Sequence, residues 1–144
     1  MFSVDTFTPY SASDYNGFRP NPGAATAFEW GTSPPGAIDF SKIPPVKKFA
    51  TLKAFTEATG QDRHSVLVDY DLFVKAQSPD RTHLRGVYKA ADFDFRRRPG
   101  SAAADAGVAI PNITDGFTGK APDLGAYELG APAPRYGPRY GPRP

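Results

Sequence analysis

The chain has no cysteine among its 144 residues. Disulfide bonds and thiolate metal sites are therefore excluded, although an oxidising compartment is not. No window approaches the ~18 apolar residues of a membrane-spanning helix. The opening residues MFSVDTFTPY lack the basic start and the apolar stretch of a signal peptide. We expect no transmembrane segment, and a chain that is cytoplasmic, processed, or a fragment of a longer one.

Aliphatic side chains are also scarce. Leu, Ile, Val and Phe together make up 28 of the 144 residues, a fraction near that of disordered proteins. Two features oppose disorder, because the net charge is only +2 and because 11 Phe, 7 Tyr and 1 Trp supply large apolar areas. We expect a core of aromatic rings beneath long loops. The small net charge argues against nucleic-acid binding.

Glycine and proline are abundant, with 14 and 16 residues. Proline breaks helices and central strands, so the composition predicts a mainly β, loop-rich fold with short elements. One short helix is predicted near residues 51–59. Thr51 is a suitable N-cap residue there, and Gly60 stands where a left-handed residue ends a helix.

Alternating apolar residues predict several short strands. Phe28 and Trp30 lie two apart and should share one face of a strand. Phe93 and Phe95 alternate with charged residues, so both rings are expected to face the core. Further strands are expected at 65–68, 72–74 and 124–129 and around Ile38 and Phe40, and a turn is expected at Asn16-Gly17.

Residues 1–130 are predicted to form a single β-rich domain, followed by a tail at 131–144. The tail reads APAPRYGPRYGPRP and contains no acidic residue. Its prolines favour a polyproline II conformation, which docks at low entropic cost, and Tyr and Arg often anchor interfaces. The alternative is a disordered, solubilising end. We predict docking on another protein chain through Arg135, Tyr136, Arg139, Tyr140 and Arg143.

The segment 98–128 combines small residues, turn formers and spaced aspartates. It contains Pro99-Gly100-Ser101 with Asp105-Ala106-Gly107, then Asp115 to Gly119, then Ala121 to Glu128. This order resembles the closing segment of secreted right-handed parallel β-helix proteins, the pectate-lyase-like group. The phrase SDYNGFRPN resembles a second, less specific part of that ending.

The resemblance implies a fold of terminal coils and a cap from a right-handed parallel β-helix. In that family the central coils perform the chemistry, so it also implies that the catalytic part is missing. We therefore expect no enzyme activity, no catalytic residues, no cofactor, and a periplasmic or extracellular location. The chain departs from the family pattern at 96–98, where three arginines precede Pro99, and at 102–104, where three alanines stand.

Aspartates beside glycine predict tight turns, because their carboxylates accept backbone N–H bonds. A structural turn role is therefore expected for Pro99, Gly100, Asp105, Gly107, Asp115, Gly116 and Asp123. Two other pairs, Asp69 with Asp71 and Asp92 with Asp94, would project from one face of a strand and offer oxygens to calcium. A solvated strand face is the simpler interpretation, and no metal site is predicted.

Histidine and arginine offer the remaining candidates for chemistry. His64 lies beside Asp62 and Ser65 in the sequence, but adjacency does not make a catalytic triad, and with His83 it makes a poor zinc site. The arginines at 96–98 would suit an anionic partner or a solvated strand edge.

The predicted function is a non-catalytic accessory or structural subunit of a larger periplasmic or cell-envelope complex, docked through the tail to other protein chains. The alternative is a carbohydrate-binding module, or the C-terminal cap of a polysaccharide lyase-like protein. That alternative requires exposed aromatic rings that stack on a polysaccharide, and Trp30 and Tyr15 are the main candidates, with Tyr10 a third.

Overall fold

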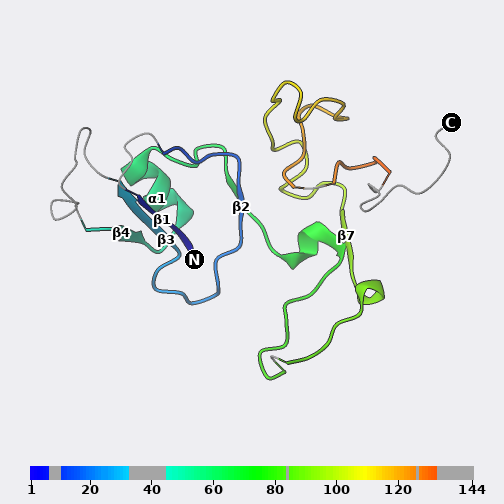
Figure 1. Cartoon of the computed structure of the whole chain (residues 1–144), viewed down its shortest axis with the longest axis horizontal. Helices are drawn as coiled ribbons and strands as arrows, with labels where there is room; N and C mark the ends of the chain where they lie inside the picture. Colours follow the sequence, from blue (N-terminus) through cyan, green and yellow to red (C-terminus); the bar gives the residue numbers. More distant parts are fainter. Residues whose placement is uncertain (7–10, 33–44, 84, 126, 133–144) are drawn as a thin grey trace.

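A computed structural model describes residues 1–6, 11–32, 45–83, 85–125 and 127–132. Within them the fold is mainly β, with small sheets, one α-helix and long loops. Figure 1 shows two lobes, an N-terminal lobe of residues 1–68 and a C-terminal lobe of residues 69–132. The tail prediction, the candidate Tyr10 and the strand expected around residues 38–40 fall outside the described residues.

The N-terminal lobe contains two small sheets. In the first, β1 (Phe2–Thr6) pairs parallel with β3 (Phe28–Thr32), and β3 pairs antiparallel with β4 (Lys47–Phe49). In the second, β2 (Gly17–Phe18) pairs parallel with β5 (Val66–Leu67). The chain therefore runs twice along a similar path, because β1 and then β2 are matched by β3 and then β5.

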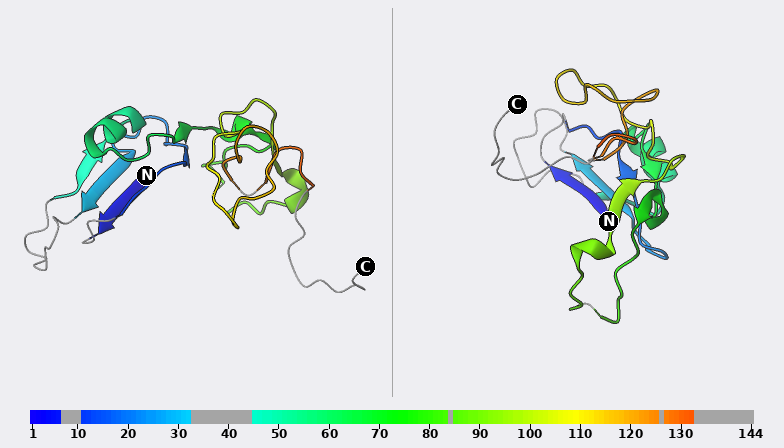
Figure 2. Two further views of the ribbon diagram at one scale, coloured as in Figure 1. Left: turned by 90° about the horizontal axis from the view of Figure 1, so that it is seen from above. Right: turned by 90° about the vertical axis from the view of Figure 1, so that its right-hand side faces the viewer.

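The predicted helix is confirmed as α1 (Leu52–Thr59). The Thr51 hydroxyl accepts a hydrogen bond from the Ala54 amide at 3.2 Å, which caps the first turn. Gly60 ends the helix with φ +72° and donates its N–H to the Thr56 carbonyl. In Figure 2 this helix lies across one face of β1, β3 and β4. Within the described residues no helix is long and apolar enough to cross a membrane.

The core is aromatic, as expected. Phe55 of α1 is 0% exposed and Phe28 of β3 is 1% exposed, and their stacked rings lie 5.3 Å apart between centroids. Trp30 and Phe49 contact Phe55 at 5.8 and 5.6 Å, and Phe2 contacts it at 6.1 Å. Rings from the sheet thus surround a single helical side chain. The prediction that Phe28 and Trp30 share one strand face is confirmed.

The C-terminal lobe has little regular structure. A 3-10 helix at Tyr70–Leu72 leads into β6 (Phe73–Lys75), which pairs antiparallel with β7 (Asp94–Arg97). A second 3-10 helix, Ala90–Asp92, precedes β7. The described residues after β7 form turns and bends, so loops make up most of this lobe.

Three strand predictions need correction. The strand expected at 65–68 is only β5, and the described residues of the strand expected at 124–129 form bends and a turn. The Leu124 amide donates to the Ala103 carbonyl and the Leu129 amide to the Asp123 carboxylate. Phe95 is 50% exposed instead of facing the core, because β7 pairs only with β6 among the described strands and its ring stacks on Phe93. Asn16-Gly17 makes no hairpin, because the bend lies at Tyr15 and Gly17 begins β2.

Replacing the central ring should lower stability strongly. We expect Phe55→Ala to reduce the free energy of unfolding by about 3–5 kcal/mol, because four other rings lose their common contact. Urea denaturation followed by circular dichroism measures this loss. Phe117→Ala, at a ring that is 36% exposed, is the matched control and should cost at least ~2 kcal/mol less. Equal losses in the two variants would contradict a core centred on Phe55.

Candidate binding cleft and carboxylate cap

Asp105 organises the loops that follow β7. Its Oδ1 accepts the Lys120 amide at 2.8 Å, and its own backbone has φ +52°. Gly119 lies so close that a Cβ atom there would be 2.2 Å from Oδ1 of Asp105. Gly107 is equally confined, because its N–H donates to the Pro122 carbonyl at 2.7 Å and a Cβ would lie 2.6 Å from that oxygen. Both glycines therefore permit close approach of two backbone segments.

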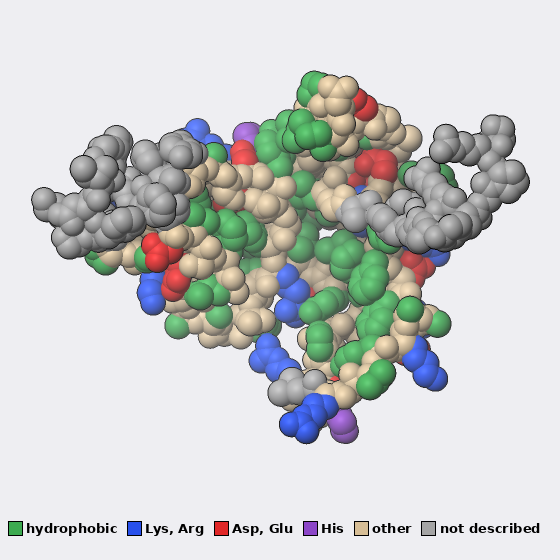
Figure 3. Space-filling model, viewed as in Figure 1, with side chains coloured by type: hydrophobic (Ala, Val, Ile, Leu, Met, Phe, Trp, Pro, Cys, Tyr) green, Lys and Arg blue, Asp and Glu red, His purple; other side chains and the backbone are tan. Residues whose placement is uncertain are grey.

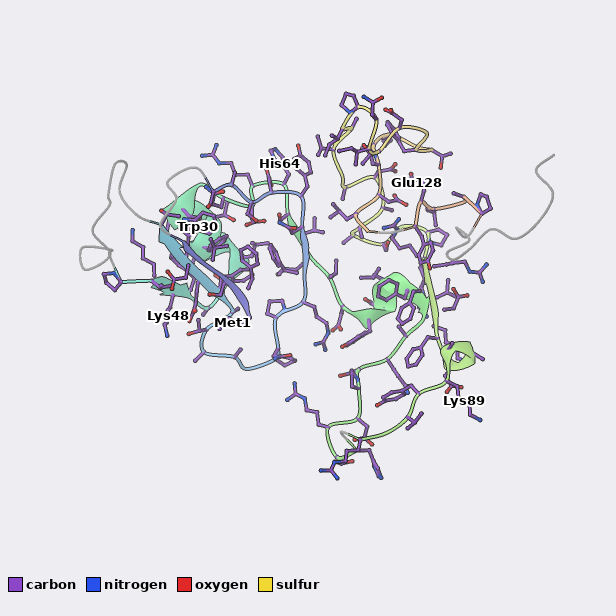
Figure 4. All side chains as sticks on the ribbon, viewed as in Figure 1. Met1, Trp30, Lys48, His64, Lys89 and Glu128 are labelled. Carbon is purple, nitrogen blue, oxygen red and sulfur yellow. The ribbon has the colours of Figure 1, made fainter. Side chains whose placement is uncertain are left out.

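Asp123 and Glu128 continue the same network. Asp123 accepts the Asp105 amide at 2.8 Å through Oδ1 and the Leu129 amide at 2.6 Å through Oδ2. Glu128 accepts the Thr118 amide at 3.2 Å and the Asp123 amide at 3.1 Å. Figure 4 labels Glu128 among these loops. We call residues 98–132, held by Asp105, Asp123 and Glu128, the carboxylate cap.

Arg97 joins this cap to β7. The residue is 5% exposed, and its Nη2 lies 3.1 Å from Oδ2 of Asp123 in an ion pair that lacks hydrogen-bond geometry. Its Nη1 donates to the Leu124 carbonyl. Its buried Nε has no acceptor among the described residues. Asp123 therefore contacts the Arg97 guanidinium of β7 and accepts hydrogen bonds from two loop amides.

The other two arginines of the run point to different partners. Arg96 makes a two-pronged ion pair with Asp94, with Nε 2.9 Å from Oδ1 and Nη2 2.5 Å from Oδ2. Arg98 donates to the Val74 carbonyl at 3.1 Å. Each arginine thus has its own acceptor, so the run does not form one anion site. The hydrogen bonds from Arg96 hold the pKa of Asp94 at about 2.

The remaining turn residues lie at the cap surface. Asp115 accepts the Asn112 amide at 2.6 Å through Oδ2, and Gly116 follows with φ +84°. Pro99 and Gly100 are exposed and form the turn that leaves β7, with Gly100 at φ +74°. Positive φ at both glycines is the reason why these turns favour that residue type.

A second buried carboxylate lies in the N-terminal lobe. Asp62 is 2% exposed, and its Oδ1 accepts from the Ser13 hydroxyl at 3.2 Å, the Asn16 amide group at 2.8 Å and the Ser65 hydroxyl at 2.7 Å. Its backbone has φ +52°. This side chain ties residues 13–16 to the segment that enters β5.

His64 pairs with Asp14 and not with its sequence neighbour Asp62. Its Nδ1 lies 2.7 Å from Oδ2 of Asp14, and the Tyr15 ring stacks on the imidazole at 4.9 Å. Burial raises the pKa of Asp14, but hydrogen bonds from His64 and from the Tyr15 amide outweigh that effect and leave the pKa below its ordinary value. Because Ser65 bonds to Asp62, the three neighbours in sequence do not form a Ser-His-Asp relay.

A cleft lies where the two lobes meet. This cleft has a volume of about 640 Å³. Figure 3 shows apolar side chains gathered over this middle part of the face. Backbone and side chains of Asn16, Gly17, Val68 and Leu124 contribute to its walls. Five aromatic residues line it: Tyr15, Tyr70, Phe73, Phe95 and Tyr127.

Polar groups in the cleft are few. Arg19 donates through Nε to Oδ1 of Asp69 at 2.7 Å, and its guanidinium lies 4.4 Å from the Tyr70 ring centroid. Asp69 also accepts the Tyr70 amide, and the hydrogen bond from Arg19 is the main cause that lowers the pKa of Asp69. Arg97 lines the same cleft from β7. This combination suits a ligand with apolar ring faces and one or two charged or hydrogen-bonding groups.

Of the residues predicted to stack on a sugar, Trp30 is buried and Tyr15 lines the cleft. Trp30 is 9% exposed and packs against Phe55, so its ring is not available to a sugar, and that prediction is wrong. In Figure 4 Trp30 lies within the N-terminal lobe and not at its edge. Tyr15 lines the cleft, although one face of its ring is covered by His64.

The two aspartates of each pair do not share a strand face. Asp69 caps the 3-10 helix that contains Asp71, and Asp92 accepts the Lys89 amide at 3.1 Å while Asp94 binds Arg96. In the part of the chain that the structure describes, no group of three or more His, Asp or Glu residues is placed to hold a metal ion.

Sequence reasoning missed several residues that build these sites. Arg97 resembled its two arginine neighbours, and Glu128 was part of a motif without an assigned role. Arg19 and Tyr70 are 51 positions apart, and no periodic signal links them. Only their contact across the cleft reveals them.

No family model, curated protein or solved structure matches this chain.

The contact between Gly119 and Asp105 yields a direct test. Gly119→Ala should destabilise the carboxylate cap, because the new methyl group would displace the carboxylate that binds Lys120. Gly116→Ala is the matched control, since it has φ +84° but nothing within 4 Å of its Cβ. We expect about 1 kcal/mol of lost stability in the control and at least ~1 kcal/mol more in Gly119→Ala, measured by urea denaturation. Equal losses would show that backbone conformation alone matters.

The ion pair of Asp94 predicts a titration. The carboxyl should titrate at a pKa of about 2, measured by NMR of its ¹³Cγ atom. Arg96→Gln should move the pKa up towards 3.8, whereas Arg98→Gln should not, since Arg98 bonds to a carbonyl. A lowered native pKa stabilises the fold above the ordinary pKa, and this contribution is lost as the pH falls through about 2. An unchanged pKa in Arg96→Gln would contradict the assignment.

Proposed function

We propose that this chain is a non-catalytic accessory or structural subunit of a larger periplasmic or extracellular protein assembly. Its fold would derive from the terminal coils and cap of a right-handed parallel β-helix. It would be held in the assembly by an open strand edge and by the C-terminal tail.

The strand pairing supports this origin. β1 and β2 belong to one pass of the chain, and β3 and β5 belong to the next, with both pairs parallel. Phe2 lies beside Phe28 in the register, and Val4 lies beside Trp30. Like residues therefore stack in successive layers, which is how solenoid proteins build a core from one repeat to the next.

The observation that carries the proposal is that β1 and β2 each have one unpaired edge among the described strands. Among the described strands, β1 pairs only with β3 and β2 pairs only with β5, so both leave one edge unpaired. Phe2 and Val4 are half-buried, whereas Phe28 and Trp30 beneath them are buried. A further layer on the open edge would bury the outer residues as fully as the inner ones, and it would satisfy the free backbone groups.

The carboxylate cap supports the same proposal from the other end. It holds residues 98–132 in place with hydrogen bonds and one buried ion pair, and its motifs are those that resemble the ending of the β-helix proteins. Carbohydrate binding remains the alternative, and Tyr15 in the cleft is the residue that favours it.

Hydrogen exchange along β1 tests the open edge. The Phe2 amide donates to the Ala27 carbonyl, so alternation along a parallel strand directs the Phe2 and Val4 amides towards β3 and the Ser3 and Asp5 amides outwards. In the isolated chain we expect fast exchange at Ser3 and Asp5 and slow exchange at Phe2 and Val4. In the purified assembly all four should exchange slowly. Fast exchange at Ser3 and Asp5 inside the assembly would refute docking at this edge.

Deleting the tail tests the second attachment. A tagged chain that lacks residues 131–144 should recover less of its partner chains than the full chain does, because the predicted anchors are removed. Quantitative mass spectrometry of the recovered complexes measures the difference. A chain of the same length in which Tyr136 and Tyr140 are replaced by Ser separates the anchors from simple chain length. Undiminished recovery in both variants would remove the tail from the proposal.

A further inference from the structure

We propose that the aromatic cleft is the binding site for the Arg-Tyr-Gly-Pro tail of this same chain, residues 133–144. The inference rests on the proposed function only in treating the tail as a docking segment. It concerns the isolated chain, in which the tail occupies a surface of the chain itself; to hold a partner chain in the assembly, the tail has to leave this cleft.

The chemistry of the cleft fits this occupant. Proline-rich segments bind in grooves lined by aromatic rings, because the proline rings pack flat on them and the extended backbone needs no further ordering. Five aromatic residues line the cleft. The tail carries Pro138 and Pro142 between its tyrosines and arginines, and Pro144 follows Arg143.

The cleft also leads towards the start of the tail. A second hollow of about 370 Å³ is lined by Val74 and by Gly130 and Ala131, which lie just before residues 133–144. Arg97 and Tyr127 line both this hollow and the aromatic cleft. A continuous path of lining residues therefore runs from the end of the carboxylate cap into the cleft.

Length permits the tail to follow this path. The twelve residues 133–144 would span ~37 Å in polyproline II geometry at ~3.1 Å per residue. Covalent attachment raises the effective concentration of such a segment to the millimolar range, so weak contacts suffice to keep it bound.

Asp69 gives the cleft an acceptor for an arginine of the tail. Asp69 has a side chain that is 64% exposed, and Arg19 and the Tyr70 amide both bind its Oδ1. No described residue donates a hydrogen bond to its Oδ2, and Asp69 lines the cleft. Arginines at every fourth position of the tail, with no acid between them, supply a cation for that oxygen.

A sugar fits the same walls less well. Saccharides need many hydroxyl partners, whereas the cleft offers few polar side chains and two of them, Arg19 and Asp69, already bind each other. Its other polar lining residues are Asn16, Arg97 and three tyrosines. Tyr15 already has one ring face covered by His64. The observations therefore favour the peptide over the glycan.

Trypsin provides the test, because it cleaves after Arg135 and Arg139. We expect both bonds in the full chain to be cleaved at least about tenfold more slowly than in a synthetic peptide of residues 131–144, since a bound segment is open only part of the time. Mass spectrometry follows each bond. Cleavage at the rate of the free peptide would overturn the proposal.

Two aromatic variants locate the site. Phe95→Ala removes a half-exposed ring from the cleft and should restore cleavage to nearly the rate of the peptide. Phe117→Ala removes an exposed ring that does not line the cleft and should leave the protection unchanged. Thermal denaturation confirms that both variants are folded. Protection that survives Phe95→Ala, or that is lost equally in both variants, would place the tail elsewhere.

Further measurements show whether the bound tail belongs to the same chain and whether a sugar binds instead. Protection that is independent of concentration supports binding within one chain, whereas protection that falls on dilution would assign the cleft to the tail of a second copy and overturn the proposal. A glucose tetrasaccharide that perturbs the Tyr15 and Phe95 NMR signals in a chain with an unprotected tail would overturn it in favour of carbohydrate. If the tail is unprotected but recovery of partner chains still requires it, this inference fails while the proposed function stands.

Discussion

Hydrogen bonds from main-chain amides to carboxylates hold the loops of this protein in place. Glycine and proline account for 30 residues, so strand ladders are short and many amides need other acceptors. Asp105, Asp123 and Glu128 supply them in the C-terminal lobe, and Asp62 accepts from side chains in the N-terminal lobe. Arg97 adds a buried cation beside Asp123. A lobe with little apolar core can therefore keep a defined shape, and its wall can form one side of a cleft.

The N-terminal lobe relies on a different interaction. Successive passes of the chain place Phe2 beside Phe28 and Val4 beside Trp30, and Phe55 closes the inner layer from α1. Each layer is buried by the one above it, and the outermost layer has no cover among the described residues. This asymmetry connects packing to the proposed role, because the surface that is least complete is also the one best shaped to accept another strand.

Sequence patterns were reliable where the cause is local. The N-cap at Thr51 and the left-handed Gly60 define α1 through bonds within one turn, and the spacing of Phe28 and Trp30 defines a strand face. They failed where the burial of a side chain depends on a segment far away in the sequence. Alternation around Phe95 indicated a core-facing ring, but the ring is 50% exposed and lines a cleft. Alternation cannot specify which face of a strand is covered.

The sequence by itself determined a mainly β, loop-rich chain with an aromatic core, one capped helix and aspartates beside tight turns, because these follow from backbone preferences over a few residues. Only the tertiary structure decided that Trp30 is buried, that the three arginines at 96–98 have three separate acceptors, and that Tyr15, Tyr70 and Phe95 line one cleft. The reason is that, apart from the pair of Arg96 with Asp94, these contacts join segments that are far apart in the sequence. No local spacing encodes which distant segments meet.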